Sequence, residues 1–164
     1  MRDFLVFNMF MDMIVEHGAQ KDISRIGELV KEFRLDDEDI KAEQFLVVKD
    51  KSSQLLGFGR LRTHTDCIEL CTLGVVAEYR GRGIGKMLVN ALAKKANADL
   101  YVVCIIPGFF EKFGFEIVEE APSSIERKVN ICTTTLVVEE SYFSMKLARK
   151  ITTKKDSEII VSLK

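Results

Sequence analysis

Apolar and polar residues alternate along this chain with two different periods, and each period predicts one kind of element. Residues 45–48 and 55–62 are short strand-forming runs on either side of a polar turn at 50–53, which predicts an antiparallel hairpin. Residues 67–76 are almost continuously apolar, as expected for a central strand that is covered on both faces. A first strand is expected at 13–16.

Helical spacing is clearest in the segment that follows the glycine-rich stretch 81–85. One face of this segment carries apolar residues at the spacing of an amphipathic helix, namely Ile84, Met87, Leu88, Ala91 and Leu92. An earlier helix is expected after Asp22, which is placed to cap it, with apolar positions recurring at helical spacing as far as Phe33. The acidic run 36–39 is expected to be a solvated loop or the start of a helix rather than a site.

The second half of the chain alternates between strands and helices. Residues 100–106 predict a strand, 109–113 a short helix that Pro107 begins, and 115–118 another strand. The order strand, helix, strand, helix, strand from residue 67 to 118 requires helices that pack on a sheet. Residues 122–128 are expected to be a loop or a short helix.

The length of 164 residues predicts a single domain over 1–164. Residues 136–138 and 142–147 are expected to complete the sheet as one bent strand or two. Residues 1–12 and 150–164 are extra segments outside this core. The apolar N-terminal run is too short and too interrupted to span a bilayer, so no membrane association is expected.

Composition narrows the classes of partner. The formal net charge of −1 gives no argument for nucleic acid. The four cysteines form no CxxC pair and the chain has only two histidines, so no metal site is expected. Reduced thiols in a cytoplasmic protein are the simpler interpretation.

The glycine-rich turn is the main candidate for chemistry. Gly81, Gly83 and Gly85 stand at alternate positions directly before a helix, where free N–H groups and the positive end of the helix dipole favour phosphate. Arg80 and Arg82 in the same turn can pair with further phosphate oxygens. The alternative is a turn that only connects a strand to a helix.

The spacing of this turn excludes two common phosphate sites. A dinucleotide fingerprint that starts at Gly81 needs glycine at the position of Lys86, and a nucleoside-triphosphate loop needs glycine where Arg80 stands and Ser or Thr where Met87 stands. The remaining pattern, Arg-x-x-Gly-x-Gly over 80–85, resembles the pyrophosphate loop of the GNAT superfamily of acetyl-CoA-dependent N-acetyltransferases.

A second stretch, 109–115, resembles the other conserved stretch of GNAT enzymes, with two aromatic residues followed by Glu-Lys and Gly-Phe. The resemblance implies an α/β (α+β) fold. Its central sheet is mixed, mostly antiparallel, has six to seven strands and is flanked by about four helices. A splayed strand pair is expected at the cofactor cleft. Residues 105–108 lean towards a subgroup that resembles amino-acid acetyltransferases.

The resemblance implies acetyl-CoA as cosubstrate and no metal. Backbone N–H groups in the glycine turn would hold the pyrophosphate, and the backbone of the preceding strand would pair with the pantetheine amides. The residues expected to bind the cofactor are Leu73, Val75, Arg80, Gly81, Arg82, Gly83, Ile84, Gly85, Lys86 and Phe110.

The resemblance also suggests how protons would move. Glu69, six residues before Val75, is the candidate general base, and its alternative is an exposed or salt-bridged strand glutamate. His64 is a rival base. Many family members carry a tyrosine at the position of Phe110 to protonate the leaving thiolate, so the acid is unassigned and Tyr142 is one candidate.

The function expected from the resemblance is N-acetyl transfer from acetyl-CoA to a primary amine of a small molecule by direct attack, with a lean towards an amino acid. The alternative is a CoA-binding regulatory module with little or no catalysis, which the absent tyrosine permits. A nucleotide-binding domain is disfavoured by the spacings. A homodimer is compatible with exposed sheet edges and a long tail.

Overall fold

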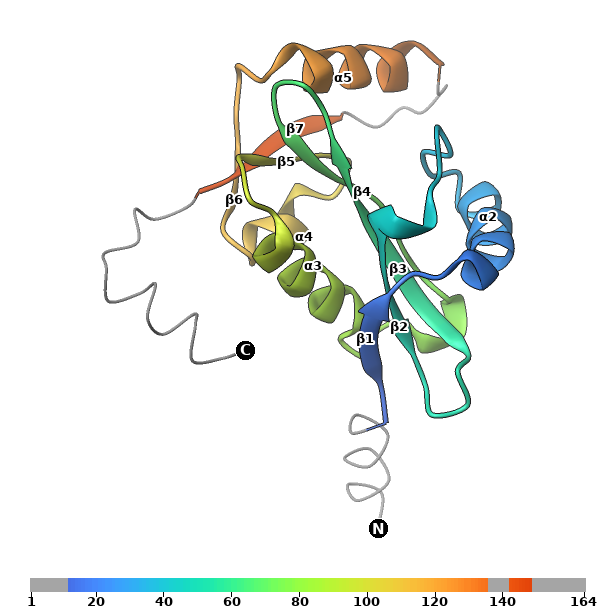
Figure 1. Ribbon diagram of the computed structural model, residues 1–164. Helices are drawn as coiled ribbons and strands as arrows, with labels where there is room; N and C mark the ends of the chain where they lie inside the picture. The colour runs from blue at the N-terminus through green and yellow to red at the C-terminus, as the bar shows by residue number, and fades with distance from the viewer. Residues whose placement is uncertain (1–11, 136–141, 149–164) are drawn as a thin grey trace.

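The computed structural model describes residues 12–135 and 142–148, and a seven-stranded sheet runs through them (Figure 1). Its spatial order is β1-β2-β3-β4-β5-β7-β6, and every neighbouring pair is antiparallel except β4 and β5. The strands are β1 Ile14–His17, β2 Phe45–Lys49, β3 Leu55–Thr63, β4 Ile68–Val75, β5 Leu100–Cys104, β6 Phe115–Ile117 and β7 Phe143–Leu147.

Helices cover both faces of this sheet. The described α-helices are α2 Ile23–Glu32, α3 Ile84–Lys95, α4 Pro107–Glu111 and α5 Ser123–Thr135. Short 3-10 turns lie at η1 Gln20–Asp22, η2 Ala42–Gln44 and η3 Ala77–Tyr79. The expected fold class, a mixed and mostly antiparallel sheet with about four helices, is therefore confirmed.

The strand β2 shows why both faces need a cover, since all five of its residues are buried. Leu46 and Val48 belong to the apolar cluster that packs with α3, whereas Phe45 and Val47 belong to the cluster that packs with α2. Successive side chains of a strand point to opposite faces, so α2 and α3 lie on opposite sides of the first strands (Figure 1).

The helix α5 covers a second part of the face on which α2 lies. Its Ile125 is fully buried against Cys67 and Tyr101. The loop or short helix expected at 122–128 is in fact the start of a helix of 13 residues. The sequence carries a signal for this longer helix, because apolar residues recur at helical spacing at Ile125, Val129 and Cys132.

The parallel strands β4 and β5 separate almost as soon as they meet. They pair only through Ile68 with Leu100 and through Glu69 with Tyr101, so the remaining six residues of β4 have no partner on β5. Within β4, Thr72 adopts a φ of 52°, and the pairing with β3 shifts register there. A bulge bends its strand, which accounts for a β4 that turns away from β5. The expected splay is confirmed.

The expected capping role of Asp22 needs correction. Asp22 directly precedes α2, but its side chain makes no capping bond to that helix; it accepts hydrogen bonds from the Ala19 N–H and from Lys49 instead. The predictions for 1–11, 136–138 and 150–164 lie outside the described residues. None of the helices described is long and apolar enough to cross a bilayer.

The close packing of β4 on β3 predicts opposite effects for two glycine substitutions. A Cβ on Gly74 would lie 2.5 Å from the buried Phe58 ring, whereas a Cβ on Gly27, inside α2, would meet nothing within 4 Å. We expect Gly74→Ala to lower the free energy of unfolding by about 1–3 kcal/mol through overpacking. Gly27→Ala should raise it by about 0.5–1 kcal/mol, because alanine favours a helix interior. Urea unfolding measures both, and equal stability of the two variants would contradict this packing.

Candidate functional site

A cluster of polar residues lies on the sheet between the areas that α2 and α5 cover. Arg62 is opposite Glu69 across β3 and β4, and Arg60 is opposite Cys71, so all four side chains share one face. This is the face on which α2 packs near one end and α5 near the other. The cluster therefore lies where neither helix supplies an apolar cover.

Arg60 anchors this cluster to the loop that precedes β2. Its side chain is fully buried. The guanidinium Nε donates to Thr72 Oγ1 at 2.9 Å, and Nη1 donates to the Glu38 carbonyl and to Gln44 Oε1, each at 3.0 Å. Thr72 Oγ1 in turn donates to the Asp36 carbonyl at 2.9 Å. The same contacts hold the loop in place and the β4 bulge in its unusual backbone conformation.

Glu69 is buried at the point where β4 and β5 separate, with a side chain that is only 1% exposed. One carboxylate oxygen pairs with the ammonium of Lys128 on α5. The other lies 2.8 Å from Nε2 of His64, so the structure joins the two residues that the sequence offered as rival bases. Lys128 also pairs with Asp36 Oδ2 at 3.0 Å.

Burial and charge act in opposite directions on this network. Burial alone would raise the pKa of the Asp36 carboxyl, but Lys128, the Glu38 N–H and Arg60 outweigh it and hold that pKa below its ordinary 3.8. Burial would lower the pKa of Lys128, yet the neighbouring Cys71, Glu69 and Asp36 raise it. Lys128 is therefore a permanent ammonium at neutral pH.

The thiol of Cys71 is not an activated nucleophile. Burial raises its pKa, and the negative charge of Glu69 raises it further. Because the thiolate is the nucleophilic form, this thiol is inert at neutral pH.

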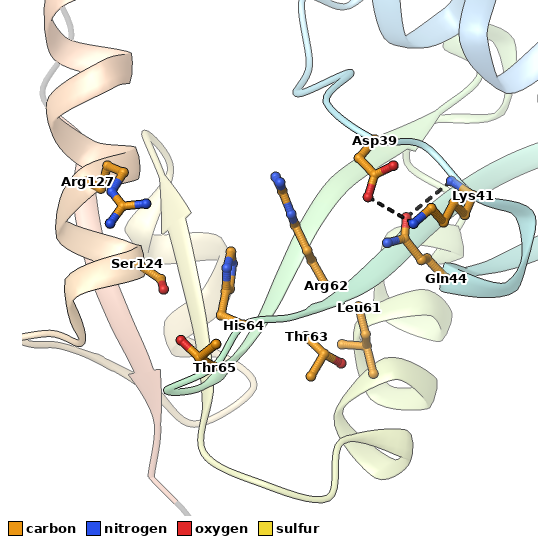
Figure 2. A pocket seen from close by; sticks show the side chains of 10 residues that line it. All are labelled: Asp39, Lys41, Gln44, Leu61, Arg62, Thr63, His64, Thr65, Ser124 and Arg127. Atoms are coloured by element: carbon orange, nitrogen blue, oxygen red, sulfur yellow. Dashed lines mark hydrogen bonds and ion pairs between the residues drawn. The ribbon is translucent and has the colours of Figure 1, made fainter.

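An open groove of about 490 Å³ lies beside the network. Figure 2 shows His64 standing at the end of β3 between Arg62 and the α5 residues Ser124 and Arg127. Cationic side chains outnumber the one carboxylate, which is Asp39. The lining residues are Asp39, Lys41, Gln44, Leu61, Arg62, Thr63, His64, Thr65, Ser124 and Arg127.

The glycine turn lies beyond the other end of β4. Gly81 and Gly83 adopt φ values of 76° and 80°, and Gly83 is the N-cap of α3. A Cβ on Gly81 would meet nothing within 4 Å, so the turn is open on that side. The first N–H groups of a helix have no acceptor within it, and a diphosphate fits this turn because it can accept from them.

The arginines of this turn contact protein groups. Arg80 Nε donates to the Val75 carbonyl at 3.1 Å, and its guanidinium stacks 4.9 Å from the centre of the Phe33 ring. Arg82 lies 5.1 Å from the centre of the Tyr79 ring. The sequence predicts that Arg80 contacts pyrophosphate. In this structure its guanidinium already donates to Val75, the strand residue that is expected to pair with pantetheine.

The other expected cofactor residues differ in exposure. Leu73, Gly85 and Lys86 are at least partly exposed. Ile84 and Phe110 are only 1% and 4% exposed and belong to the main core. Phe110 packs edge-on against Phe109 and Phe115, so its contribution to a cofactor site stays a prediction. Ile84 could offer only its backbone.

Tyr142, the candidate acid, directly precedes β7 and is half-buried. Its neighbour Phe143 pairs with Cys104, the last residue of β5. This places Tyr142 at the carboxyl end of β5, on the side towards which β4 and β5 separate. Its role as a proton donor stays a prediction.

Three participants in the network were missed from the sequence. Asp36 belongs to the run 36–39, for which the sequence predicts a solvated loop or the start of a helix rather than a site, but it is half-buried and paired. Arg60 had no distinguishing motif, and Lys128 lies on a helix whose length was underestimated. The one signal in the sequence was that Arg60 is a charged residue within an apolar strand, which indicates a buried charge that needs partners.

Within residues 12–135 and 142–148, no group of three or more His, Cys, Asp or Glu side chains could hold a metal ion.

Comparison with known proteins gives concordant matches. The family model described as an acetyltransferase (GNAT) domain matches residues 41–117, which include β2 to β6 and the glycine turn. An uncharacterized N-acetyltransferase of Chlorobaculum tepidum is 27% identical over 100 residues. That match covers 57% of this chain and 64% of the relative, so the chain spans less than two thirds of the relative's length.

Solved structures share the fold at low sequence identity. Rv2747 from Mycobacterium tuberculosis, in complex with CoA and NLQ, has a TM-score of 0.67 at 20% identity, covering 84% of this chain and 99% of that one. N-acetylglutamate synthase from Neisseria gonorrhoeae, complexed with coenzyme A and L-arginine, has a TM-score of 0.66 at 18% identity. The match covers 84% of this chain and 34% of the synthase chain.

The pairing of Asp36 predicts a stability difference that depends on pH. Because its pKa is depressed in the folded state, Asp36 contributes stability above its unfolded pKa, and this is lost as pH falls through the folded value. We expect Asp36→Asn to lower the free energy of unfolding by about 2 kcal/mol at pH 7. This magnitude lies between the losses that follow when an exposed ion pair and a buried ion pair are broken. The deficit should shrink below about pH 4.

Urea unfolding of both proteins at pH 7 and pH 3 measures this effect. Asp37→Asn is the matched control, since Asp37 is exposed on the same loop. A deficit for Asp36→Asn that is independent of pH would show that the carboxylate charge is not what stabilises the loop.

Proposed function

Because the chain belongs to the GNAT superfamily of acetyltransferases, we propose that it transfers an acetyl group from acetyl-CoA to a primary amine of a small molecule. The observation that carries this proposal is the separation of β4 from β5 directly after Glu69, between a buried polar network and an open glycine turn. We take the whole of 1–164 as one acetyltransferase domain.

The backbone of β4 and the turn after it form the proposed cofactor site. When bound, acetyl-CoA supplies a thioester whose acetyl group an amine can attack. Backbone N–H groups at Gly83 and Gly85 would donate hydrogen bonds to the pyrophosphate, and the edge of β4 that lacks a β5 partner, at Leu73 and Val75, would pair with the pantetheine amides. Glu69 and Val75 are six positions apart along the chain, which corresponds to about 20 Å of extended strand and separates the diphosphate from the reacting end.

The groove beside His64 is the proposed site of the acceptor. It opens on the same polar network, and its lining carries Lys41, Arg62 and Arg127 against a single carboxylate. Lys41 and Arg62 are paired with acidic neighbours, whereas no ion pair or hydrogen bond to Arg127 is found in the described part of the chain. A cationic lining favours an amine that also carries a carboxylate, which supports an amino acid.

The Glu69–His64 pair is the proposed proton acceptor. An ammonium cannot attack a thioester until it loses a proton, and these two residues are the titratable groups in contact between the groove and the point where the strands separate. Tyr142 remains the proposed donor to the leaving thiolate, since Phe110 has no proton to give.

Turnover of acetyl-CoA with a panel of primary amines tests this function. The panel contains amino acids and the corresponding amines that lack the carboxylate. We expect acetylation of at least one amine, faster for the carboxylate-bearing member of a pair, and a loss of that preference in Arg127→Ala. Thermal stabilisation by CoA without acetylation of any amine would instead support a CoA-binding module without catalysis.

The conformation of the glycine turn predicts the effect of a methyl group on cofactor affinity. Gly83→Ala places a Cβ at a φ of 80° at the mouth of α3, where the backbone must approach the diphosphate. We expect the Kd of CoA, measured by calorimetry, to rise at least tenfold. Gly114→Ala is the matched control, because Gly114 has a φ of 88° in the turn between α4 and β6 and should show similar strain. Equal loss of CoA affinity in both variants would assign the effect to stability alone.

A further inference from the structure

We propose that His64 is the general base of this site and that Glu69 is a positioning residue which acts through it. The inference rests on the proposed acetyl transfer and divides the roles of the two residues. It reverses the assignment that the sequence favoured, in which Glu69 itself takes the proton.

The first observation is that Glu69 has no free oxygen to offer. One carboxylate oxygen is paired with Lys128 and the other is 2.8 Å from His64. The side chain is 1% exposed and does not line the groove. An acceptor amine could reach this carboxylate only by displacing Lys128 or His64.

The second observation is that His64 connects the buried carboxylate to the groove. Its side chain is 17% exposed and lines the groove (Figure 2). Nε2 is the nitrogen that contacts Glu69, and no residue of the described chain bonds Nδ1. With Nε2–H donating to Glu69, the lone pair is on Nδ1, which is the nitrogen left to meet the amine.

The charges around the pair fit this division. Lys128, which is also paired with Asp36, holds the Glu69 carboxylate, and Glu69 stabilises the imidazolium that forms when His64 takes a proton. The charged side chains that line the groove with His64 are Arg62 from β3, Arg127 from α5, and Asp39 and Lys41 from the loop before β2. Among the carboxylates near the groove in the described part of the chain, that of Glu69 is the one in contact with the imidazole.

The proton balance of the step is complete. The acceptor ammonium gives one proton to Nδ1 of His64, which later passes it to water in the groove. The neutral amine nitrogen then forms a bond to the acetyl carbon as the C–S bond breaks. The leaving thiolate takes a proton from Tyr142, the proposed donor, and the second proton of the amine nitrogen restores that of Tyr142. The products are the amide, the free thiol of CoA and one proton released to solvent.

The first test compares His64→Gln with Glu69→Gln across pH. Glutamine keeps an N–H that can donate to Glu69 but is not a base. We expect kcat/KM of His64→Gln to fall on the order of 10²-fold at neutral pH. The loss should shrink as pH approaches the pKa of the amine, where the substrate deprotonates itself. Glu69→Gln should lower kcat more than it changes KM.

The second readout needs neither cofactor nor turnover. The chain has only two histidines, so nitrogen NMR can assign His64 by comparison with His17→Gln. We expect the neutral Nε2–H tautomer of His64 in the parent protein and a shift towards Nδ1–H in Glu69→Gln, because the new amide can donate to Nε2. Circular dichroism should show all variants folded, and His17→Gln should retain full activity.

The outcomes separate this inference from the function on which it rests. Absence of acetyl transfer in the parent protein would overturn the proposed function and, with it, the catalytic role of His64. Normal transfer in the parent and in His64→Gln at neutral pH would overturn the inference alone. An Nδ1–H tautomer in the parent protein would also overturn it, since the lone pair would then face Glu69.

Discussion

A fully buried guanidinium constrains the part of this fold on which the site depends. Arg60 lies within the sheet with no exposure to water, and a buried charge is tolerated only when its donors are paired. Its partners are Thr72 of β4 and the loop groups Glu38 and Gln44. The need to satisfy one guanidinium therefore fixes the loop before β2 and the bulge in β4 together.

That bulge connects fold to chemistry. A β-branched residue rarely adopts a positive φ, and such strain persists only where the surroundings hold it. Thr72 is held by Arg60 on one side and by the Asp36 carbonyl on the other. The bend that results separates β4 from β5 and leaves backbone groups of β4 without strand partners, which is what a pantetheine arm would need. The splay is thus a consequence of polar contacts on the sheet face that α2 and α5 partly cover.

The helix α5 completes the site from a distant part of the chain. Its first turn is tied to Asp66 through Ser123 and Ser124, and Ile125 is buried against the sheet. These contacts bring Lys128 onto Glu69. Without this ammonium, Glu69 would be a buried carboxylate with one partner, so the position of α5 determines the electrostatic character of the point where β4 and β5 separate.

The sequence by itself determined whatever depends on local geometry. Strand and helix periodicity predicted the sheet and α3, and glycines in a fixed spacing predicted the open turn, because backbone limits and side-chain period act over a few residues. Only the tertiary structure decided which charges meet. Lys128 and Glu69 are 59 positions apart, and Arg60 and Asp36 are 24 apart. These contacts form because α5 and the loop before β2 pack on the same face of the sheet. The pattern of residues within a short segment does not predict such packing.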